Sequence, residues 1–145
     1  MKVRFVRINE NAVQPRYSTD SAAGADICAL PGTDTIIQPG ETVMIHTGIA
    51  METPDGYAAL VYARSGMASR RGLAPANKVG VIDPDYRGEV MVALHNHSSE
   101  AQIVKGGERI AQIVITPFVR ADFTESDSLS DTARGKGGFG STGTF

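Results

Sequence analysis

Short runs of β-branched and aromatic residues, separated by Pro-Gly or Pro-Asp-Gly, constrain the fold of this chain more than any other feature. Runs of this kind are typical of strands, and the turn residues between them leave little room for long helices. About eight to ten strands at such spacing predict an all-β fold: an antiparallel sandwich, jelly roll or barrel. The expected strands are residues 3–8, 25–30, 35–38, 41–51, 57–63, 79–82, 89–97 and 109–118, and only Ser65–Arg71 could form a helix.

Length and charge exclude several classes of protein. The 145 residues fit a single domain. Basic and acidic residues, 14 and 16 in number, are intermixed, so no cationic field indicates nucleic acid or an anionic membrane as a partner. Cys28 is the only cysteine, which excludes an internal disulfide framework. Residues 1–7 lack an apolar signal-peptide core, and no run of about 18 apolar residues could span a membrane. We therefore expect a cytoplasmic protein.

The composition changes near the C-terminus, where polar residues replace the strand-like runs from Asp122 onward. The sequence therefore predicts a β domain over residues 1–127 and a flexible arm over residues 128–145. The arm could be an ordinary frayed terminus. Residues 134–143 also suit a polyphosphate, because they combine glycine amides, two cations and two hydroxyls, and Phe139 offers a face on which a base can stack.

Residues 77–89 carry an acid and an aromatic ring at a predicted turn. Pro84 disfavours the helical region for Asp83, and Pro84-Asp85 fits the centre of a type I turn closed by Tyr86. Residues 79–82 and 88–94 then read as the two strands of a hairpin. Asp83 could simply accept a bond within its own turn. It could equally form, with Tyr86 and the backbone at Gly80, a wall for a planar ligand.

Other segments could contribute chemistry. Arg64-Ser65-Gly66 follows a strand and opens the possible helix, where it could meet an anion or merely provide a serine cap. Asp26 begins a strand, where a role in a turn is the default. Gln112 lies in an apolar strand and needs a polar partner. His95 and His97 share one strand face and could bind a metal, but no third ligand is evident.

Taken together and in order, these segments resemble the trimeric dUTPase family over essentially the whole chain. Each match is weak alone, but chance agreement of five motifs at the family's order and spacing is remote. The matching motifs are Ala23-Gly24-Ala25-Asp26, Arg64-Ser65-Gly66, residues 77–88, Gly107-Glu108-Arg109-Ile110-Ala111-Gln112 and residues 134–143.

The resemblance implies a jelly-roll subunit, or β-sandwich-like barrel, in a homotrimer with active sites shared between subunits. The C-terminal arm would close over a neighbour's site. It also implies an enzyme, a dUTP diphosphatase, which hydrolyses dUTP to dUMP and pyrophosphate by attack of water on the α-phosphate. Such an activity limits uracil in DNA and supplies dUMP for thymidylate synthesis.

The resemblance also implies the roles of single residues. Asp83 would be the general base that orients the water, and it would act mainly by position because a carboxylate is a weak base. Gln112 would lie near that water and the phosphates, and Arg64 and Asp26 would form a supporting pair. The substrate-binding residues would be Ser65, Gly66, Asn77, Val81, Tyr86, Arg134, Phe139, Gly140, Ser141 and Thr142.

The implied cofactor is Mg²⁺, held chiefly by the triphosphate and water rather than by direct protein ligands, with Asp26 a possible outer-sphere contact. Two alternatives remain open at this point. A dCTP deaminase shares the fold, but its catalytic glutamate would align with Ala93. A non-catalytic nucleotide-binding jelly roll would not need Asp83 or the arm.

Overall fold

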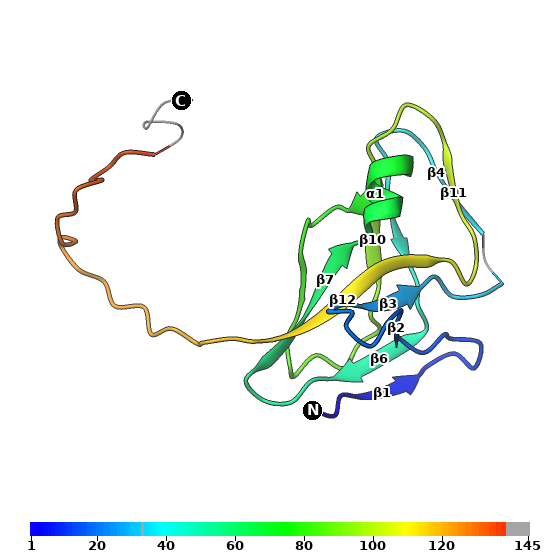
Figure 1. Ribbon diagram of the computed structural model, residues 1–145, viewed down its shortest axis with the longest axis horizontal. Helices are drawn as coiled ribbons and strands as arrows, with labels where there is room; N and C mark the ends of the chain where they lie inside the picture. The colour runs from blue at the N-terminus through cyan, green and yellow to red at the C-terminus, as the bar shows by residue number, and fades with distance from the viewer. Residues whose placement is uncertain (33, 139–145) are drawn as a thin grey trace.

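The computed structural model describes residues 1–32 and 34–138, and in these residues it shows a mostly β domain with one short helix (Figure 1). The fold class predicted from the sequence is confirmed, as is the helix over Ser65–Arg71. The elements in chain order are β1 (Arg4–Arg7), β2 (Arg16–Tyr17), β3 (Ala25–Cys28), β4 (Thr35–Ile37), β5 (Thr42–Ile45), β6 (Ile49–Glu52), β7 (Tyr57–Ala63), α1 (Ser65–Arg71), β8 (Leu73–Pro75), β9 (Gly80–Ile82), β10 (Val92–Asn96), β11 (Gln102–Val104) and β12 (Arg109–Pro117).

The strands form a sandwich-like arrangement of small antiparallel sheets. The largest sheet has the order β2-β3-β12-β7-β9, and a three-stranded sheet has the order β5-β10-β8. The pairs β1-β6 and β11-β4 complete the body. Because β12 pairs with both β3 and β7, it brings Gln112 opposite Asp26 on one side and Tyr62 on the other. This register places residues from distant parts of the sequence at one end of the sheet.

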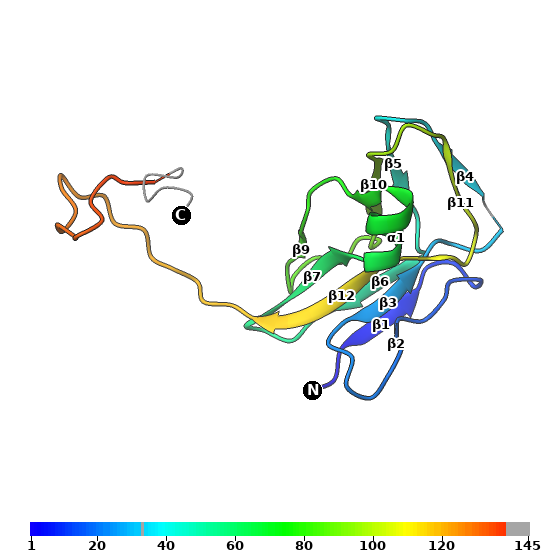
Figure 2. The same cartoon turned by 45° about the horizontal axis from the view of Figure 1, so that its top comes forward.

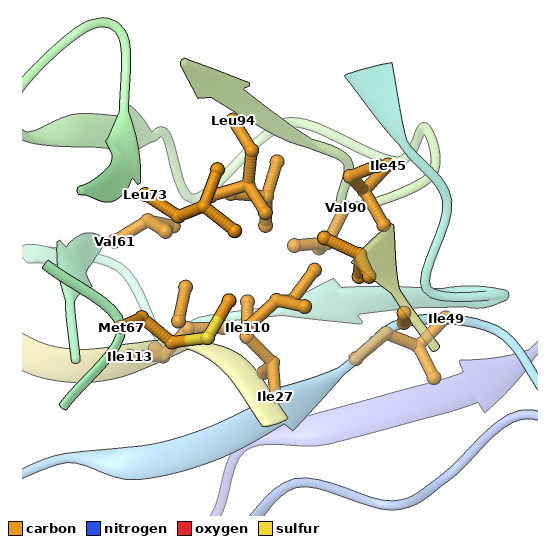
Figure 3. Close-up of a cluster of buried hydrophobic side chains, with 14 of the residues drawn as sticks. Ile27, Ile45, Ile49, Val61, Met67, Leu73, Val90, Leu94, Ile110 and Ile113 are labelled. Atoms are coloured by element: carbon orange, nitrogen blue, oxygen red, sulfur yellow. The ribbon is translucent and has the colours of Figure 1, made fainter. Parts of the chain in front are cut away.

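One apolar core fills the space between the sheets. Figure 3 shows side chains from both large sheets and from α1 facing one another, among them Ile27, Ile110 and Leu94. Met67 is the buried residue of α1, and its side chain joins this cluster. Met67 holds the helix against the core, whereas Ser65 and Gly66 at its start remain exposed next to the end of β7.

The predicted hairpin around Asp83 is wrong in its pairing, although the turn itself is present. β9 pairs with β7, whereas β10 pairs with β5 and β8, so the two expected partners belong to different sheets. Residues 83–91 connect them. The Val90 amide donates to the Ile49 carbonyl at 2.8 Å, and this contact with β6 draws the chain away from β9.

The predicted strand over residues 41–51 is also corrected, because it divides into β5 and β6. Gly48 lies between them with a φ of 71°, a conformation that favours glycine. A Cβ there would lie 2.8 Å from Leu30 Cδ1 and 2.9 Å from Ala12 Cβ. The bend therefore requires glycine for both reasons. The strands β2, β8 and β11 were not predicted, because runs of two or three residues carry no readable periodicity.

Beyond β12 the described chain extends away from the body without helix or strand (Figures 1 and 2). Val119, Phe123 and Leu129 are 94%, 95% and 91% exposed. The hydrogen bonds recorded for residues 119–138 join these residues to one another. The division into a domain over residues 1–127 and an arm remains a prediction. None of the described residues belongs to a helix long and apolar enough to cross a membrane.

Candidate functional site

The turn after β9 forms one wall of a cavity of about 220 Å³, here called the turn cavity. The Tyr86 amide donates to the Asp83 carbonyl at 3.2 Å, which closes the predicted turn. Asp83 is exposed, so its carboxylate is open to water. Among the residues that line the cavity are Asn77, Val81, Asp83, Tyr86 and Glu89.

The floor of the turn cavity is shaped by the approach of Asn77 to the backbone of Gly80. A Cβ on Gly80 would lie 3.1 Å from Asn77 Nδ2 and 3.2 Å from Val61 Cβ. The space beside the Gly80 backbone is therefore occupied by the side-chain amide of Asn77. Lys78 accommodates the tight turn with a φ of 64°, and the Val79 amide donates to the Asn77 carbonyl at 2.7 Å.

Tyr86 is fixed by contacts on the far side of the turn. Its hydroxyl donates to the Glu89 carbonyl at 3.0 Å, and its ring lies so close to Gly88 that a Cβ there would be 2.6 Å from Tyr86 Cζ. Glycine at position 88 therefore lets the ring fold back along the chain. The side chain keeps 43% of its surface exposed, which leaves one ring face available to a ligand.

Glu89 is a residue of this site that sequence reasoning missed. Its carboxylate accepts hydrogen bonds from the Thr47 and Gly48 amides at 3.1 and 2.7 Å, and it lies 2.7 Å from His46 Nδ1. Burial acts to raise the pKa of Glu89, but these contacts outweigh it and the pKa lies below its usual value. Glu89 thereby ties the turn to the bend between β5 and β6. No local motif signals a pairing between residues so far apart in sequence.

A second cavity, of about 530 Å³, contains the other predicted residues of the body. It is here called the phosphate cavity after the ligand that the resemblance implies for these residues. Asp26, Arg64, Ser65, Gly66 and Gln112 all line it. The five lie on β3, the end of β7, α1 and β12, which the sheet register brings together. The structure brings these five residues together, and their roles remain predictions.

Asp26 is the centre of an ion-pair network at this cavity. Its carboxylate accepts a hydrogen bond from Arg64 Nε at 2.7 Å, from Ser18 Oγ at 2.8 Å and from Arg109 Nη1 at 3.1 Å. Burial acts to raise its pKa, but the hydrogen bonds from Ser18 and the two arginines outweigh burial, so the pKa is lowered. The carboxylate is therefore ionised and positions both guanidinium groups. Arg109 was absent from the predicted site.

Gln112 is fixed by a backbone contact and by a glycine. Its Nε2 donates to the Ala63 carbonyl at 2.9 Å, and none of the described residues donates a hydrogen bond to its Oε1. A Cβ on Gly24 would lie 2.6 Å from that Oε1 and 3.2 Å from Gln112 Cβ. Only glycine at position 24 leaves this side chain in place, which gives Gly24 a steric role at the cavity.

The start of α1 contributes exposed backbone to the phosphate cavity. Arg64 is the N-cap and no side chain caps the helix, so the alternative of a capping serine is wrong. Ser65 and Gly66 are exposed, and a Cβ on Gly66 would have no atom within 4 Å. The first amides of a helix lack acceptors within it, and no side chain caps them in α1.

Of the C-terminal residues predicted to bind substrate, the structure describes Arg134, which lines neither cavity. Arg134 Nε donates to the Gly137 carbonyl at 2.9 Å, a contact within the arm itself. Phe139, Gly140, Ser141 and Thr142 lie outside the described residues. Residues 1–32 and 34–138 contain no group of three or more histidine, cysteine or acidic residues that could hold a metal. His95 lies against His97, and its Nδ1 is 2.8 Å from Thr42 Oγ1.

The fold and the two cavities define a jelly-roll protein with an acid at an apolar slot and a separate cavity in which Asp26 is paired with arginines. The family model described as dUTPase matches residues 10–143. The chain belongs to the dUTPase family.

Individual relatives agree with this assignment. The deoxyuridine 5'-triphosphate nucleotidohydrolase of Desulfitobacterium hafniense strain DCB-2 is 50% identical over 144 residues, which cover 99% of this chain and 95% of the relative. The protein of the same name from Nautilia profundicola is 49% identical over 143 residues, with 99% of each chain covered. Among solved structures, a dUTPase variant of Staphylococcus bacteriophage 80alpha with dUpNHpp has a TM-score of 0.88 and 25% identity, with 99% of each chain covered.

Proposed function

We propose that this protein is a dUTP diphosphatase, which hydrolyses dUTP to dUMP and pyrophosphate. The observation that carries the proposal is the turn cavity, where Asp83 and Tyr86 flank a slot lined by backbone. The phosphate cavity supplies a guanidinium group, a hydroxyl and exposed backbone, which are the groups that can bind a triphosphate. The chain also belongs to the dUTPase family. The relatives at 50% and 49% identity carry the name of this activity.

Asp83 acts as the general base. An exposed carboxylate at a rigid turn can accept a proton from a water molecule and orient its oxygen toward the α-phosphorus. The new phosphorus–oxygen bond forms as the bond to the bridging oxygen breaks, and pyrophosphate leaves with that oxygen. Because the turn holds Asp83 through the Tyr86 amide, position contributes more than basicity.

The turn cavity selects the nucleoside. Asn77 and the backbone at Val81 pair with the uracil edge, and Tyr86 packs against the deoxyribose so that a 2′-hydroxyl has no room. Discrimination by a methyl group in an apolar pocket is worth only about 1–3 kcal/mol. Exclusion of thymine therefore depends on overlap with rigid backbone, which the close packing of Asn77, Gly80 and Val61 supports.

The phosphate cavity holds the triphosphate. Ser65 and Gly66 contribute a hydroxyl and exposed amides, and Arg64 contributes positive charge. Gln112 donates through Nε2 to the Ala63 carbonyl, and its Oε1 contacts water near the reaction centre. Asp26 acts on the substrate through Arg64, whose Nε it binds at 2.7 Å. This arrangement stabilises negative charge with groups that are already in place before the substrate arrives.

Magnesium is the proposed cofactor, and the donor set fits an ion carried by the substrate. Mg²⁺ keeps several waters and prefers phosphate oxygens to an all-protein cage. Asp26, whose oxygens already accept three hydrogen bonds, would contact the hydrated ion only from its outer sphere. When bound, Mg²⁺ neutralises charge on the triphosphate.

We further propose a cytoplasmic homotrimer whose active sites are shared between subunits. The two cavities have no described lining residue in common, which is compatible with a site completed by a second subunit. The arm would close over a neighbour's site through Arg134 and residues 139–142. Sedimentation tests the assembly, and truncation after Asp131 should leave a folded trimer with a much lower kcat/KM for dUTP.

Comparison of nucleotides by pyrophosphate release is the direct test of the activity. With Mg²⁺ present, dUTP should be consumed and dCTP, dTTP and UTP left largely intact. In water enriched in oxygen-18, the label should appear in dUMP. Release of ammonia from dCTP would indicate a deaminase instead, and binding of dUTP without any turnover would indicate a nucleotide-binding module.

A further inference from the structure

His95 and His97 form a pair on the sheet β5-β10-β8, and neither of them lines the turn cavity or the phosphate cavity. His95 lies on β10 and His97 directly follows this strand. The His97 amide donates to the Gly72 carbonyl at 2.8 Å, which extends the pairing of β10 beyond its last residue. Residues two apart in an extended chain point to the same face, and the two ring centroids are 4.3 Å apart. The structure therefore brings together two imidazoles that have no part in the proposed hydrolysis.

The backbone between the two histidines is held by Asn96, whose side chain points to the opposite face and is 0% exposed. Its Nδ2 donates to the Ile37 and Glu100 carbonyls at 2.9 and 2.8 Å. Its Oδ1 accepts hydrogen bonds from the Ser98 amide at 2.9 Å and from Ser98 Oγ at 2.7 Å. The spacing of the histidines is therefore set before any ligand binds, which lowers the entropy cost of binding.

Thr42 orients the His95 ring. It lies directly opposite His95 on β5, and its Oγ1 is 2.8 Å from His95 Nδ1. When Nδ1 carries the proton it donates to this hydroxyl, and Nε2 then has a free lone pair. Histidines that bind metals usually have such a partner on their other ring nitrogen. His97 is exposed, and none of the described residues forms a hydrogen bond with its ring, so it can turn toward the same ligand.

The spacing of the rings suits a single metal ion. A transition-metal ion lies about 2.1 Å from an imidazole nitrogen, so two rings in cis positions have centroids roughly 4.5 Å apart. The observed separation of 4.3 Å is close to this value. Imidazole is a good ligand for Cu²⁺, Ni²⁺ and Zn²⁺, whereas Mg²⁺ prefers oxygen. The charge of Lys78 acts on His97 and opposes a cation there, so the affinity should be lower than that of a closed site with three or four protein ligands.

We propose that His95 and His97 chelate a divalent transition-metal ion, with Cu²⁺ bound more tightly than Ni²⁺ or Zn²⁺. Water completes the coordination of the ion. The site is separate from the Mg²⁺ that the triphosphate carries, and the inference does not depend on the proposed function.

Single substitutions separate the three histidines of the chain. Binding of Cu²⁺ and of Zn²⁺ to the untagged full chain is measured by calorimetry without nucleotide. His95→Gln and His97→Gln should each bind at least about 100-fold more weakly, because loss of a ligand exceeds the effect of losing a residue that only supports one. His46→Gln is the matched control, since His46 Nδ1 is paired with Glu89 Oε2 at 2.7 Å, and it should bind both ions as wild type does.

Electron paramagnetic resonance of the Cu²⁺ complex identifies the ligands directly. Wild type should show two nitrogen ligands, and His95→Gln and His97→Gln at most one. Thr42→Val should weaken binding about tenfold and Thr42→Ser should restore it, as expected for a residue that orients a metal-binding histidine. Wild-type affinity in His97→Gln, whose exposed side chain lies outside β10, would overturn the site. Loss of binding in His46→Gln, or displacement of Cu²⁺ by an excess of Mg²⁺, would overturn it as well.

Discussion

The turn cavity and the phosphate cavity are built from different kinds of interaction. In the turn cavity, glycines at positions 80 and 88 admit Asn77 and Tyr86 to within contact distance of the backbone, so packing decides the shape. In the phosphate cavity, Asp26 fixes two arginines through charged hydrogen bonds. Packing can discriminate ligands by steric overlap, whereas an ion-pair network can bind charge but is sensitive to pH and salt. Substitutions in the turn cavity should therefore change which ligands are excluded, whereas substitutions in the phosphate cavity should change the response to pH and salt.

The largest expected effect comes from removing the charge of Asp83 without changing the shape of the turn. Asp83→Asn should lower kcat for pyrophosphate release about 1000-fold, within the range attributed to general base catalysis, while dUTP still binds. Rapid-quench turnover and calorimetric binding provide the two measurements. Asp85→Asn makes the same change two residues away in the same turn and should keep most of the activity. Near-normal turnover in Asp83→Asn would remove this residue from the mechanism.

The next largest effect comes from breaking the ion-pair network of the phosphate cavity. Asp26→Asn leaves Arg64 and Arg109 without their carboxylate and should reduce the free energy of unfolding by about 2 kcal/mol at neutral pH, the size of a hydrogen bond to a charged group. The loss is smaller than for a fully buried pair because both arginines are partly exposed. Because the folded-state pKa of Asp26 is lowered, its contribution is fully present above the unfolded pKa of about 4 and is lost as pH falls through the folded value.

Urea unfolding at pH 7 and at acid pH checks the sign of this effect. Wild type and Asp26→Asn should differ most at pH 7 and converge in acid. Asp20→Asn, an exposed carboxylate in the same region of the chain, should show little difference at either pH. A gap between wild type and Asp26→Asn that widened in acid would contradict the lowered pKa.

A smaller effect tests packing within the phosphate cavity. Gly24→Ala should displace the Gln112 side chain, because the new Cβ would lie 2.6 Å from its Oε1, and kcat/KM should fall about tenfold, or 1.4 kcal/mol. A double-mutant cycle isolates the cause. In a Gln112→Ala background the glycine substitution should add almost nothing. Additive losses would show that Gly24 acts independently of Gln112.

The sequence predicts those features of the two cavities that depend on local chemistry. Pro84 and Asp85 determine the turn at Asp83, and the short helix at Ser65–Arg71 follows from its residues with the predicted bounds. Contacts between distant residues could not be predicted. Arg109 joins Asp26 across 83 residues and Glu89 reaches Gly48 across 41. The separation of β9 from β10 has the same origin, because the choice of partner strand depends on the bend at Gly48 and on the whole sandwich.

The smallest effect returns to the turn cavity and tests whether shape alone governs it. Tyr86→Phe keeps the ring that folds over Gly88 but removes the hydrogen bond to the Glu89 carbonyl. Such a bond contributes about 1 kcal/mol, so KM for dUTP should rise about fivefold while kcat stays within twofold. Tyr17→Phe, which removes an exposed hydroxyl on β2, should change neither constant. If UTP became a substrate in Tyr86→Phe, the bond would be needed to hold the ring where it excludes the 2′-hydroxyl; unchanged selectivity would assign that exclusion to the contact between the ring and Gly88.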